Sequence, residues 1–345
     1  MTANPIVVEV TRGPLVESRH RGALAIAGAD GRIVLSLGDT KAPVFPRSAV
    51  KLLQALPLVE SGAARAFAFT DAEIALACSS HNGEPVHVET ARSMLAKAGL
   101  NEDYLECGPQ PPARDEDRFA LREAGIAPGR IHNNCSGKHA GMLAVACFMG
   151  VDPRGYSGAN HPVQQRVRQV MEEITGVPLT AERCGIDGCS IPTWAAPLDS
   201  WAIAFAKVAS GRGVDAGRAE ALAHLRSAAT NHPFMVAGTG RFCTILMDRL
   251  GASAFVKTGA EGVYCAALPE TGLGIALKID DGGARAAECL MAAATALHAG
   301  LSEAQQVSLS DLVALPVKNR VGITVGGIRV AAGANTSLAT VSGRL

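Results

Sequence analysis

The first forty residues alternate between apolar segments and turn residues, which predicts β-strands. Apolar segments at 6–10, 22–28 and 33–39 are separated by Arg-Gly-Pro and by Ala-Asp-Gly-Arg. An Asp-Gly pair between two segments rich in β-branched and aliphatic residues favours a tight hairpin turn. The chain therefore begins with strands, two of which form a hairpin around residues 29–32.

After Pro46 the apolar spacing becomes helical and continues to Gly62. The same three- and four-residue spacing predicts further helices at 71–79, 86–98, 138–149, 161–175, 215–229, 239–250 and 284–299. Three apolar segments between Gly and Pro turns predict consecutive strands at 254–259, 262–269 and 273–281. Residues 325–333 predict another pair of strands. Strands at both ends of a mainly helical chain indicate one sheet built from both termini.

Composition and charge narrow the classes of protein that the chain can belong to. Its 345 residues contain 32 basic and 32 acidic side chains, a balance that argues against a nucleic-acid or anionic-membrane partner. With 48% hydrophobic residues, the chain can bury a large core and is not disordered. It shows no signal peptide and no apolar stretch of about 18 residues that could span a membrane. Nine irregularly spaced cysteines, an odd number, fit reduced thiols, so we expect a cytoplasmic protein.

Three short motifs suggest nucleophilic catalysis. Ser48 and Lys51 stand at i and i+3 of a predicted helix, Ser80 begins Ser-His-Asn, and Lys257 begins Lys-Thr-Gly. Side chains at i and i+3 share a helix face, so the lysine can reach the serine hydroxyl. It can accept the hydroxyl proton only if burial or a second cation, such as Lys257, lowers its pKa. Ser48 alone would be interpreted as an N-cap; the three motifs in this order favour catalysis.

These motifs resemble those of serine β-lactamases, penicillin-binding proteins and glutaminases, although their spacing differs. No counterpart of the additional glutamate base of class A β-lactamases is found, which leaves lysine as the base. A closer resemblance, to the Rhizobium-type (thermolabile) L-asparaginase family, extends over six blocks: PRSAVKLLQALP, CSSHNGE, HNNCSGKHAGML, GIDGCSIPT, NHPFMVAG and KTGAEGVY. It implies hydrolysis of L-asparagine to aspartate and ammonia by a homodimer. The implied catalytic pairs are Ser48 with Lys51 and Ser80 with Lys257.

The fold expected from this resemblance is an α/β (α+β), β-lactamase/glutaminase-like fold. We expect an antiparallel sheet built from both chain ends plus a helical lobe. The expected domain is a single one, 1–345, with the helical region at approximately 47–250.

The resemblance also implies a zinc site formed by Cys135, Lys138 and Cys189. Spacing alone would not indicate it, because most free cysteines are small buried apolar residues. Lysine is a rare ligand that must bind as the neutral amine, so metal uptake should release its proton. Asp187, two residues before Cys189, could orient a ligand or meet a cationic α-amino group.

The charges of asparagine suggest the remaining binding residues. Arg47 suits the α-carboxylate, although it could be a solvated arginine at a helix start. Asp187, with Glu84, suits the α-ammonium. Asn134 and His139 could hold the carboxylate or the side-chain amide, and His139 could equally be a satisfied polar residue.

Three functions therefore compete. The first is an amidohydrolase in which Ser48 attacks the side-chain amide of L-asparagine. The second is a glutaminase or a broader ω-amidase, because one methylene changes binding by only about 1–3 kcal/mol. The third is a sensor module that is acylated without turnover.

Overall fold

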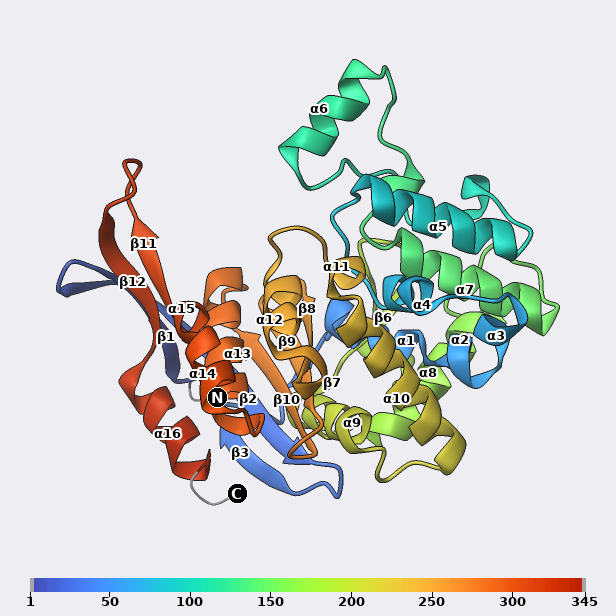
Figure 1. The fold of residues 1–345 in the computed structure, drawn as a ribbon. Coiled ribbons are helices and arrows are strands. Elements are labelled where there is room, and N and C mark those ends of the chain that lie inside the picture. The colour runs from blue at the N-terminus through green and yellow to red at the C-terminus, as the bar shows by residue number, and fades with distance from the viewer. Residues whose placement is uncertain (1–2, 343–345) are drawn as a thin grey trace. The chain divides into compact units, whose positions relative to one another are not determined.

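Strands from both ends of the chain form one eight-stranded sheet (Figure 1). The computed structural model describes residues 3–342. The sheet order is β11-β12-β1-β2-β10-β9-β8, β3 also pairs with β2, and every pairing is antiparallel. The strands are β1 (Ile6–Arg12), β2 (Leu15–Gly28), β3 (Ile33–Leu37), β8 (Phe255–Gly259), β9 (Val263–Leu268), β10 (Leu273–Ile279), β11 (Ala314–Lys318) and β12 (Thr324–Val330). The mixed α/β fold with an antiparallel sheet from both termini is confirmed.

The chain divides into two compact units, which we call the sheet unit and the helical unit. The sheet unit contains Met1–Ala49, Ala195–Val214 and Leu246–Leu345, and the helical unit contains Val50–Trp194 and Asp215–Ile245. The helical unit falls within the predicted helical region 47–250. The assignment of the whole chain to a single domain stays a prediction.

The hairpin predicted at residues 29–32 joins β2 to β3 and is closed by a bond from Gly28 N to Arg32 O of 2.9 Å. The strands predicted at 254–281 are β8, β9 and β10. The prediction of a pair of strands within 325–333 is wrong. The strand in this segment, β12, ends at Val330 and pairs with the earlier strand β11. Residues Ala332–Ser342 form the helix α16, since the sequence there turns to Ala, Gly and polar residues that no longer alternate.

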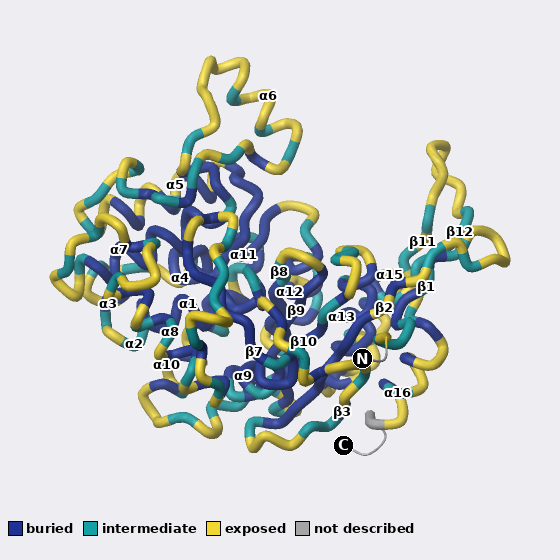
Figure 2. Tube along the Cα trace, turned by 180° about the vertical axis from the view of Figure 1, so that it is seen from behind, coloured by how far each residue is buried: buried dark blue, intermediate teal, exposed yellow. Residues whose placement is uncertain are grey.

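One buried helix is absent from the sequence prediction. Helix α9 (Leu198–Ser210) packs against β2, β9 and β10, and β9 itself is buried along its whole length (Figure 2). Ten of its thirteen residues are buried and none is exposed. Its close packing requires Gly274 of β10, where a Cβ atom would lie 2.1 Å from Ala202 O and 2.2 Å from Ala206 N.

The other elements of the sheet unit are shorter connections and flanking helices. They are β4 (Pro43–Val44), β7 (Ala196–Pro197), α13 (Ala284–His298), α14 (Glu303–Ser308) and α15 (Ser310–Val313). Helix α12 (Phe242–Leu250) contains the point at which the chain passes from the helical unit into the sheet unit.

Among the described residues, the helical unit consists of ten α-helices and a short β-hairpin. They are α1 (Lys51–Gln54), α2 (Leu56–Glu60), α3 (Ala63–Ala66), α4 (Asp71–Ala77), α5 (Pro85–Lys97), α6 (Asp115–Glu123), α7 (Ser136–Met149), α8 (Pro162–Thr175), α10 (Ala216–Asn231), α11 (Pro233–Val236), β5 (Cys184–Ile186) and β6 (Pro192–Trp194). The predicted helices at 71–79, 86–98, 138–149, 161–175 and 215–229 are confirmed to within a few residues. None of the helices in the described part of the chain combines the length and apolar character needed to cross a bilayer.

The continuous helix predicted from Pro46 to Gly62 is wrong. The segment instead divides into a 3₁₀ turn, η1 (Arg47–Val50), followed by α1 and α2. Pro57 has no N–H to bond the carbonyl of Leu53, so the helix cannot run through it unbroken. The division places Lys51 at the start of α1 and Ser48 inside the preceding turn.

Replacing Gly274 by Ala should destabilise the sheet unit. The added Cβ would overlap backbone atoms of α9, which cannot move aside as a side chain could. We expect the free energy of unfolding to fall by about 3 kcal/mol, the upper end of overpacking costs. Gly333→Ala in α16 is the matched control, because no atom lies within 4 Å of its added Cβ. Equal unfolding midpoints for the two variants in a urea titration would contradict this packing.

Candidate active site

In the sheet unit, the segment that carries Ser48 lies against the end of β8. Gly259 closes the Lys-Thr-Gly motif, and a Cβ atom on it would come 2.5 Å from Pro46 O and 3.2 Å from Ala49 N. Only a glycine permits this approach, so the motif and the serine segment lie side by side. Lys257 is completely buried and donates a hydrogen bond to Thr258 O at 3.0 Å.

The residue before Ser48 has an unusual backbone. Arg47 has φ of +51°, a left-handed conformation that few non-glycine residues adopt. Such backbone strain persists only where the surrounding structure enforces it, and it is concentrated at functional sites. Arg47 and Ser48 are both half-buried.

In the helical unit, Lys51 is completely buried and its ammonium group is held by three acceptors. The Nζ atom donates to Ser79 O at 2.5 Å, to Ser80 Oγ at 2.9 Å and to Cys135 Sγ at 3.1 Å. Burial lowers the pKa of Lys51, and the charge on Lys138 lowers it further, against the opposing effect of the sulfurs of Cys135 and Cys189. The structure therefore joins residues from two predicted pairs, Lys51 and Ser80.

The three predicted zinc ligands lie together in the helical unit. Cys135 immediately precedes α7, and Lys138 is one helical turn further on. Lys138 Nζ lies 3.0 Å from Cys189 Sγ, and the two cysteines hydrogen-bond each other. The hydrogen bond from Cys189, followed by the charges of Lys138 and Lys51, keeps the pKa of Cys135 well below its ordinary value despite its burial. The same hydrogen bond and burial raise the pKa of Cys189.

This donor set fits a zinc ion in chemical type. Thiolate sulfur and neutral nitrogen are both accepted zinc ligands. No group of three His, Cys, Asp or Glu side chains suited to a metal occurs among residues 3–342, so any such site depends on Lys138 as the third ligand.

Asp187 and Asn134 border this cluster. Asp187 is half-buried in the β5–β6 turn, and its charge contributes to the raised pKa of Lys138, although burial opposes that rise and the two cysteine sulfurs contribute more. The turn is closed by a bond from Ser190 N to Asp187 O at 2.9 Å, with Ser190 at φ of +75°. Asn134 Oδ1 lies 2.9 Å from Cys135 Sγ.

The surroundings of His139 and Glu84 leave these side chains little hydrogen-bonding capacity for a substrate. His139 is completely buried in α7, and its Nδ1 lies 2.5 Å from the Tyr156 hydroxyl. Its Nε2 has no hydrogen-bond partner in the described part of the chain, so only this atom remains to meet a ligand. The Glu84 carboxylate already accepts four hydrogen bonds from Asn82, Arg114 and Thr239. Sequence reasoning missed Arg114 and Thr239, which stand outside the recognised blocks.

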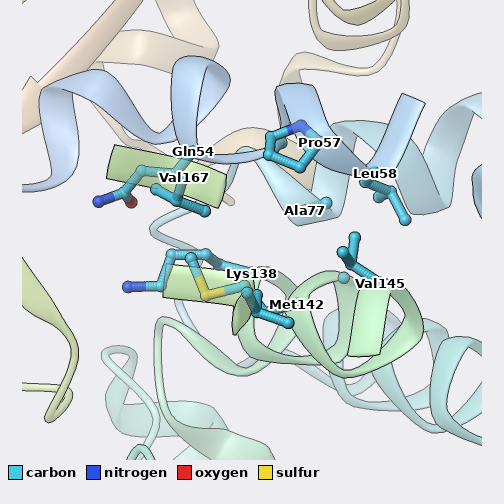
Figure 3. Close-up of a pocket in the computed structure, with 11 residues that line it drawn as sticks. Gln54, Pro57, Leu58, Ala77, Lys138, Met142, Val145 and Val167 are labelled. Atoms are coloured by element: carbon cyan, nitrogen blue, oxygen red, sulfur yellow. The ribbon is translucent and has the colours of Figure 1, made fainter. Parts of the chain in front are cut away.

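A small cavity beside Lys138 is too small for an amino acid. Its volume is about 10 Å³, close to the space that one water needs. Apolar side chains form most of its wall, and the side chains of Gln54 and Lys138 extend toward the same side of it (Figure 3). Substrate therefore does not bind in this cavity.

The sequence model of the family described as L-asparaginase II matches residues 8–330. The chain therefore belongs to the L-asparaginase II family, which confirms the resemblance of the six blocks and supports an amidohydrolase activity. A comparison with curated protein sequences finds no match.

Solved structures show a more distant similarity. A structure of Mglu in its native form with 4.3 M NaCl is 14% identical, with a TM-score of 0.43, over 82% of this chain and 63% of that one. A β-lactamase from Mycobacterium bovis is 15% identical, with a TM-score of 0.41, over 81% of this chain and 95% of that one. The chain thus spans less than two thirds of Mglu, and the family assignment rests on the sequence match.

The buried histidines of the Ser-His-Asn region should make stability depend on pH. Burial, followed by the charges of His87 and Lys51, holds the pKa of His81 well below its ordinary value of 6.5, and burial also lowers that of His87. Both rings stay neutral in the folded protein, whereas the unfolded chain takes up protons below about pH 6.5. The contribution of these histidines to the free energy of unfolding should therefore be complete above that pH. It should be lost progressively as the pH falls below it.

The comparison variant is His81→Asn, whose side-chain oxygen can replace Nδ1 as acceptor for Gly83 N, a bond of 3.0 Å. Its unfolding free energy, measured in urea at about pH 5 and about pH 7.5, should change less than that of the wild type. The same acid-side loss in both proteins would show that His81 does not contribute.

Proposed function

We propose that the chain hydrolyses L-asparagine to L-aspartate and ammonia through an acyl-enzyme on Ser48. The observation that carries the proposal is the buried amine of Lys51, which lies three residues after Ser48 and is 2.9 Å from Ser80 Oγ. The choice of Ser48 as the nucleophile rests on the family resemblance. A lysine whose neutral form is favoured by burial can serve as a base for a nearby hydroxyl. Membership in the L-asparaginase II family supports the substrate class.

In the proposed first half-reaction, Ser48 Oγ bonds to the side-chain amide carbon while its proton passes to the Lys51 amine. The C–N bond then breaks, and the nitrogen leaves as ammonia after receiving that proton. In the second half, water attacks the aspartyl ester, its proton is taken by the same base, and the Ser48 hydroxyl is restored as L-aspartate departs. Ser80 and Lys257 are further proposed catalytic residues, Ser80 through its hydrogen bond to Lys51.

The proposed substrate contacts follow from charge. Arg47 binds the α-carboxylate, and Asp187 binds the α-ammonium, because both are half-buried and of the required sign. Asn134 and the Nε2 atom of His139 are the proposed neutral contacts. Glu84 is not among the proposed substrate contacts, since its oxygens are already hydrogen-bonded.

Zinc is the proposed metal, held by Cys135, Lys138 and Cys189. When bound, it would supply a Lewis-acid contact for the amino-acid head of the substrate. When zinc binds, Lys138 and Cys189 must release their protons. We further propose a homodimer in the cytoplasm, supported by the family resemblance and by the absence of any disulfide among the nine cysteines, all of which the structure describes.

The first experiment measures ammonia release by the purified chain from L-asparagine and from L-glutamine. We expect repeated turnover, with a higher kcat/KM on L-asparagine. A higher kcat/KM on L-glutamine would favour a glutaminase. Release of a single equivalent of ammonia per chain would indicate an acylated sensor and contradict the proposal.

Ser48→Ala should abolish this turnover while the protein stays folded. The variant loses one hydroxyl, and even if that hydroxyl caps the helical turn the cost to stability is only about 0.5–2 kcal/mol. Loss of a covalent nucleophile should reduce kcat by orders of magnitude. A folded variant with more than about a tenth of wild-type kcat would show that Ser48 is not the nucleophile.

Removal of the proposed zinc ligands should have two separate effects. Cys135→Ala and Cys189→Ala should lower the zinc content found by elemental analysis, whereas Cys265→Ala, at a cysteine buried in β9, should not. Cys189→Ala, which leaves the bond between Lys51 and Cys135 in place, should raise KM more than it lowers kcat, because a contact to the substrate head is present in the ground and transition states alike. Wild-type protein without zinc would exclude the site, and a collapse of kcat at unchanged KM would exclude the substrate-holding role.

A further inference from the structure

Glu84 is a buried carboxylate whose hydrogen-bonding capacity is fully used. It is only 4% exposed and caps the start of α5. Its Oε1 atom accepts from Thr239 N at 2.7 Å and from Asn82 Nδ2 at 3.1 Å, and its Oε2 atom accepts from Thr239 Oγ1 at 2.7 Å and from Arg114 at 2.9 Å. A carboxylate offers about four acceptor positions, so none remains for a substrate ammonium.

These bonds join two chain segments that are far apart in the sequence, 80–84 and 236–241. Ser80 N donates to Val236 O at 2.9 Å, and Asn82 Nδ2 donates to Thr239 O at 3.0 Å. Arg241 donates to Asn82 Oδ1 at 3.0 Å. Together with the two Thr239 bonds to Glu84, they fix the backbone that carries Ser80.

The backbone between the two segments is shaped for this contact. Gly238 has φ of +104°, and a Cβ atom on it would lie 2.6 Å from Glu84 Oε1 and 2.8 Å from Asn82 Nδ2. Glycine is therefore required for the carboxylate and the amide to approach the turn at 238–240. The close approach indicates that the arrangement is specific and is not a loose surface contact.

We propose that Glu84 is a positioning residue for Ser80, which it holds at Lys51 through Asn82 and Thr239, with Arg114 fixing the carboxylate from the other side. The inference rests on the proposed function, because it assumes that Ser80 takes part in the reaction. The bond of 2.9 Å between Lys51 Nζ and Ser80 Oγ depends on where the 80–84 segment lies. A displacement of about 1 Å in a catalytic group can cost about a hundredfold in rate.

Glu84→Gln tests this role, because the amide keeps the shape of the carboxylate but replaces one acceptor oxygen by an NH₂ group. That group faces a donor, Thr239 or Arg114, whichever way the amide is turned. We expect kcat for L-asparagine to fall by about ten- to a hundredfold, with KM and the inhibition constant of L-aspartate changed by less than about twofold. Loss of an ammonium contact would instead raise KM and weaken L-aspartate binding, and that result would overturn the proposal.

Glu73→Gln is the matched control for stability. Glu73 is 3% exposed in α4, and its carboxylate likewise accepts four hydrogen bonds, from Thr70, Ser93 and Lys97. It makes none of the bonds that join the two segments. Both variants should lower the unfolding temperature by similar amounts, but only Glu84→Gln should lower kcat more than about threefold. An equal loss of kcat in both variants would reduce the role of Glu84 to stability and overturn the proposal.

Two further variants test the path through Thr239 and Ser80. Thr239→Ser keeps the hydroxyl donor and should retain kcat within about threefold, whereas Thr239→Val should reproduce much of the Glu84→Gln loss. In a Ser80→Ala background, Glu84→Gln should cause no further loss of kcat, because the group that it positions is gone. A full, additive loss in that background would overturn the proposal. If Ser80→Ala alone keeps the wild-type kcat, both this role of Glu84 and the proposed function of Ser80 are overturned. If Ser80→Ala is inactive but Glu84→Gln keeps the wild-type kcat, only the role of Glu84 is overturned.

Discussion

The buried ammonium of Lys51 is the constraint on which the arrangement of the helical unit depends. A charged amine without solvent is costly unless its protons meet acceptors. Here Lys51 Nζ reaches three acceptors, Ser79 O, Ser80 Oγ and Cys135 Sγ, which come from two separate segments of the chain. Each segment must be held so that its acceptor reaches Nζ, and the bonds around Glu84 and at the start of α7 do this.

A second buried amine, that of Lys138, lies beside the first, and the two amines account for the position of Cys135 and Cys189. Two neighbouring ammonium groups repel each other, and their mutual effect lowers the pKa of Lys51. The sulfur of Cys135 accepts a hydrogen bond from Lys51, and the sulfur of Cys189 accepts one from Lys138. The same sulfur and nitrogen atoms that balance charge in this structure are those proposed to bind zinc, so removing either cysteine should affect more than metal content.

The sequence predicted those parts that are governed by local spacing. The terminal strands, most helices and the family could be recognised, because each depends on short patterns such as the hairpin at 29–32 or the six blocks. Helix α9 was not predicted, and its burial against three strands of the sheet is visible only in the structure. Glu84 was predicted to bind substrate because its charge suits an ammonium; its saturation by Thr239 and Arg114 depends on contacts between distant segments. The link between Lys51 and Ser80 was hidden for the same reason, as the motifs suggested other pairs.

The most direct test of this account is to identify the acylated residue. Wild-type protein and Lys51→Met would be mixed with L-asparagine, quenched in acid during turnover, digested and examined by mass spectrometry. The account predicts an aspartyl ester on the peptide that contains Ser48 in the wild type and its loss in Lys51→Met. An ester on Ser80 alone, or an equal yield of the Ser48 ester without Lys51, would contradict it.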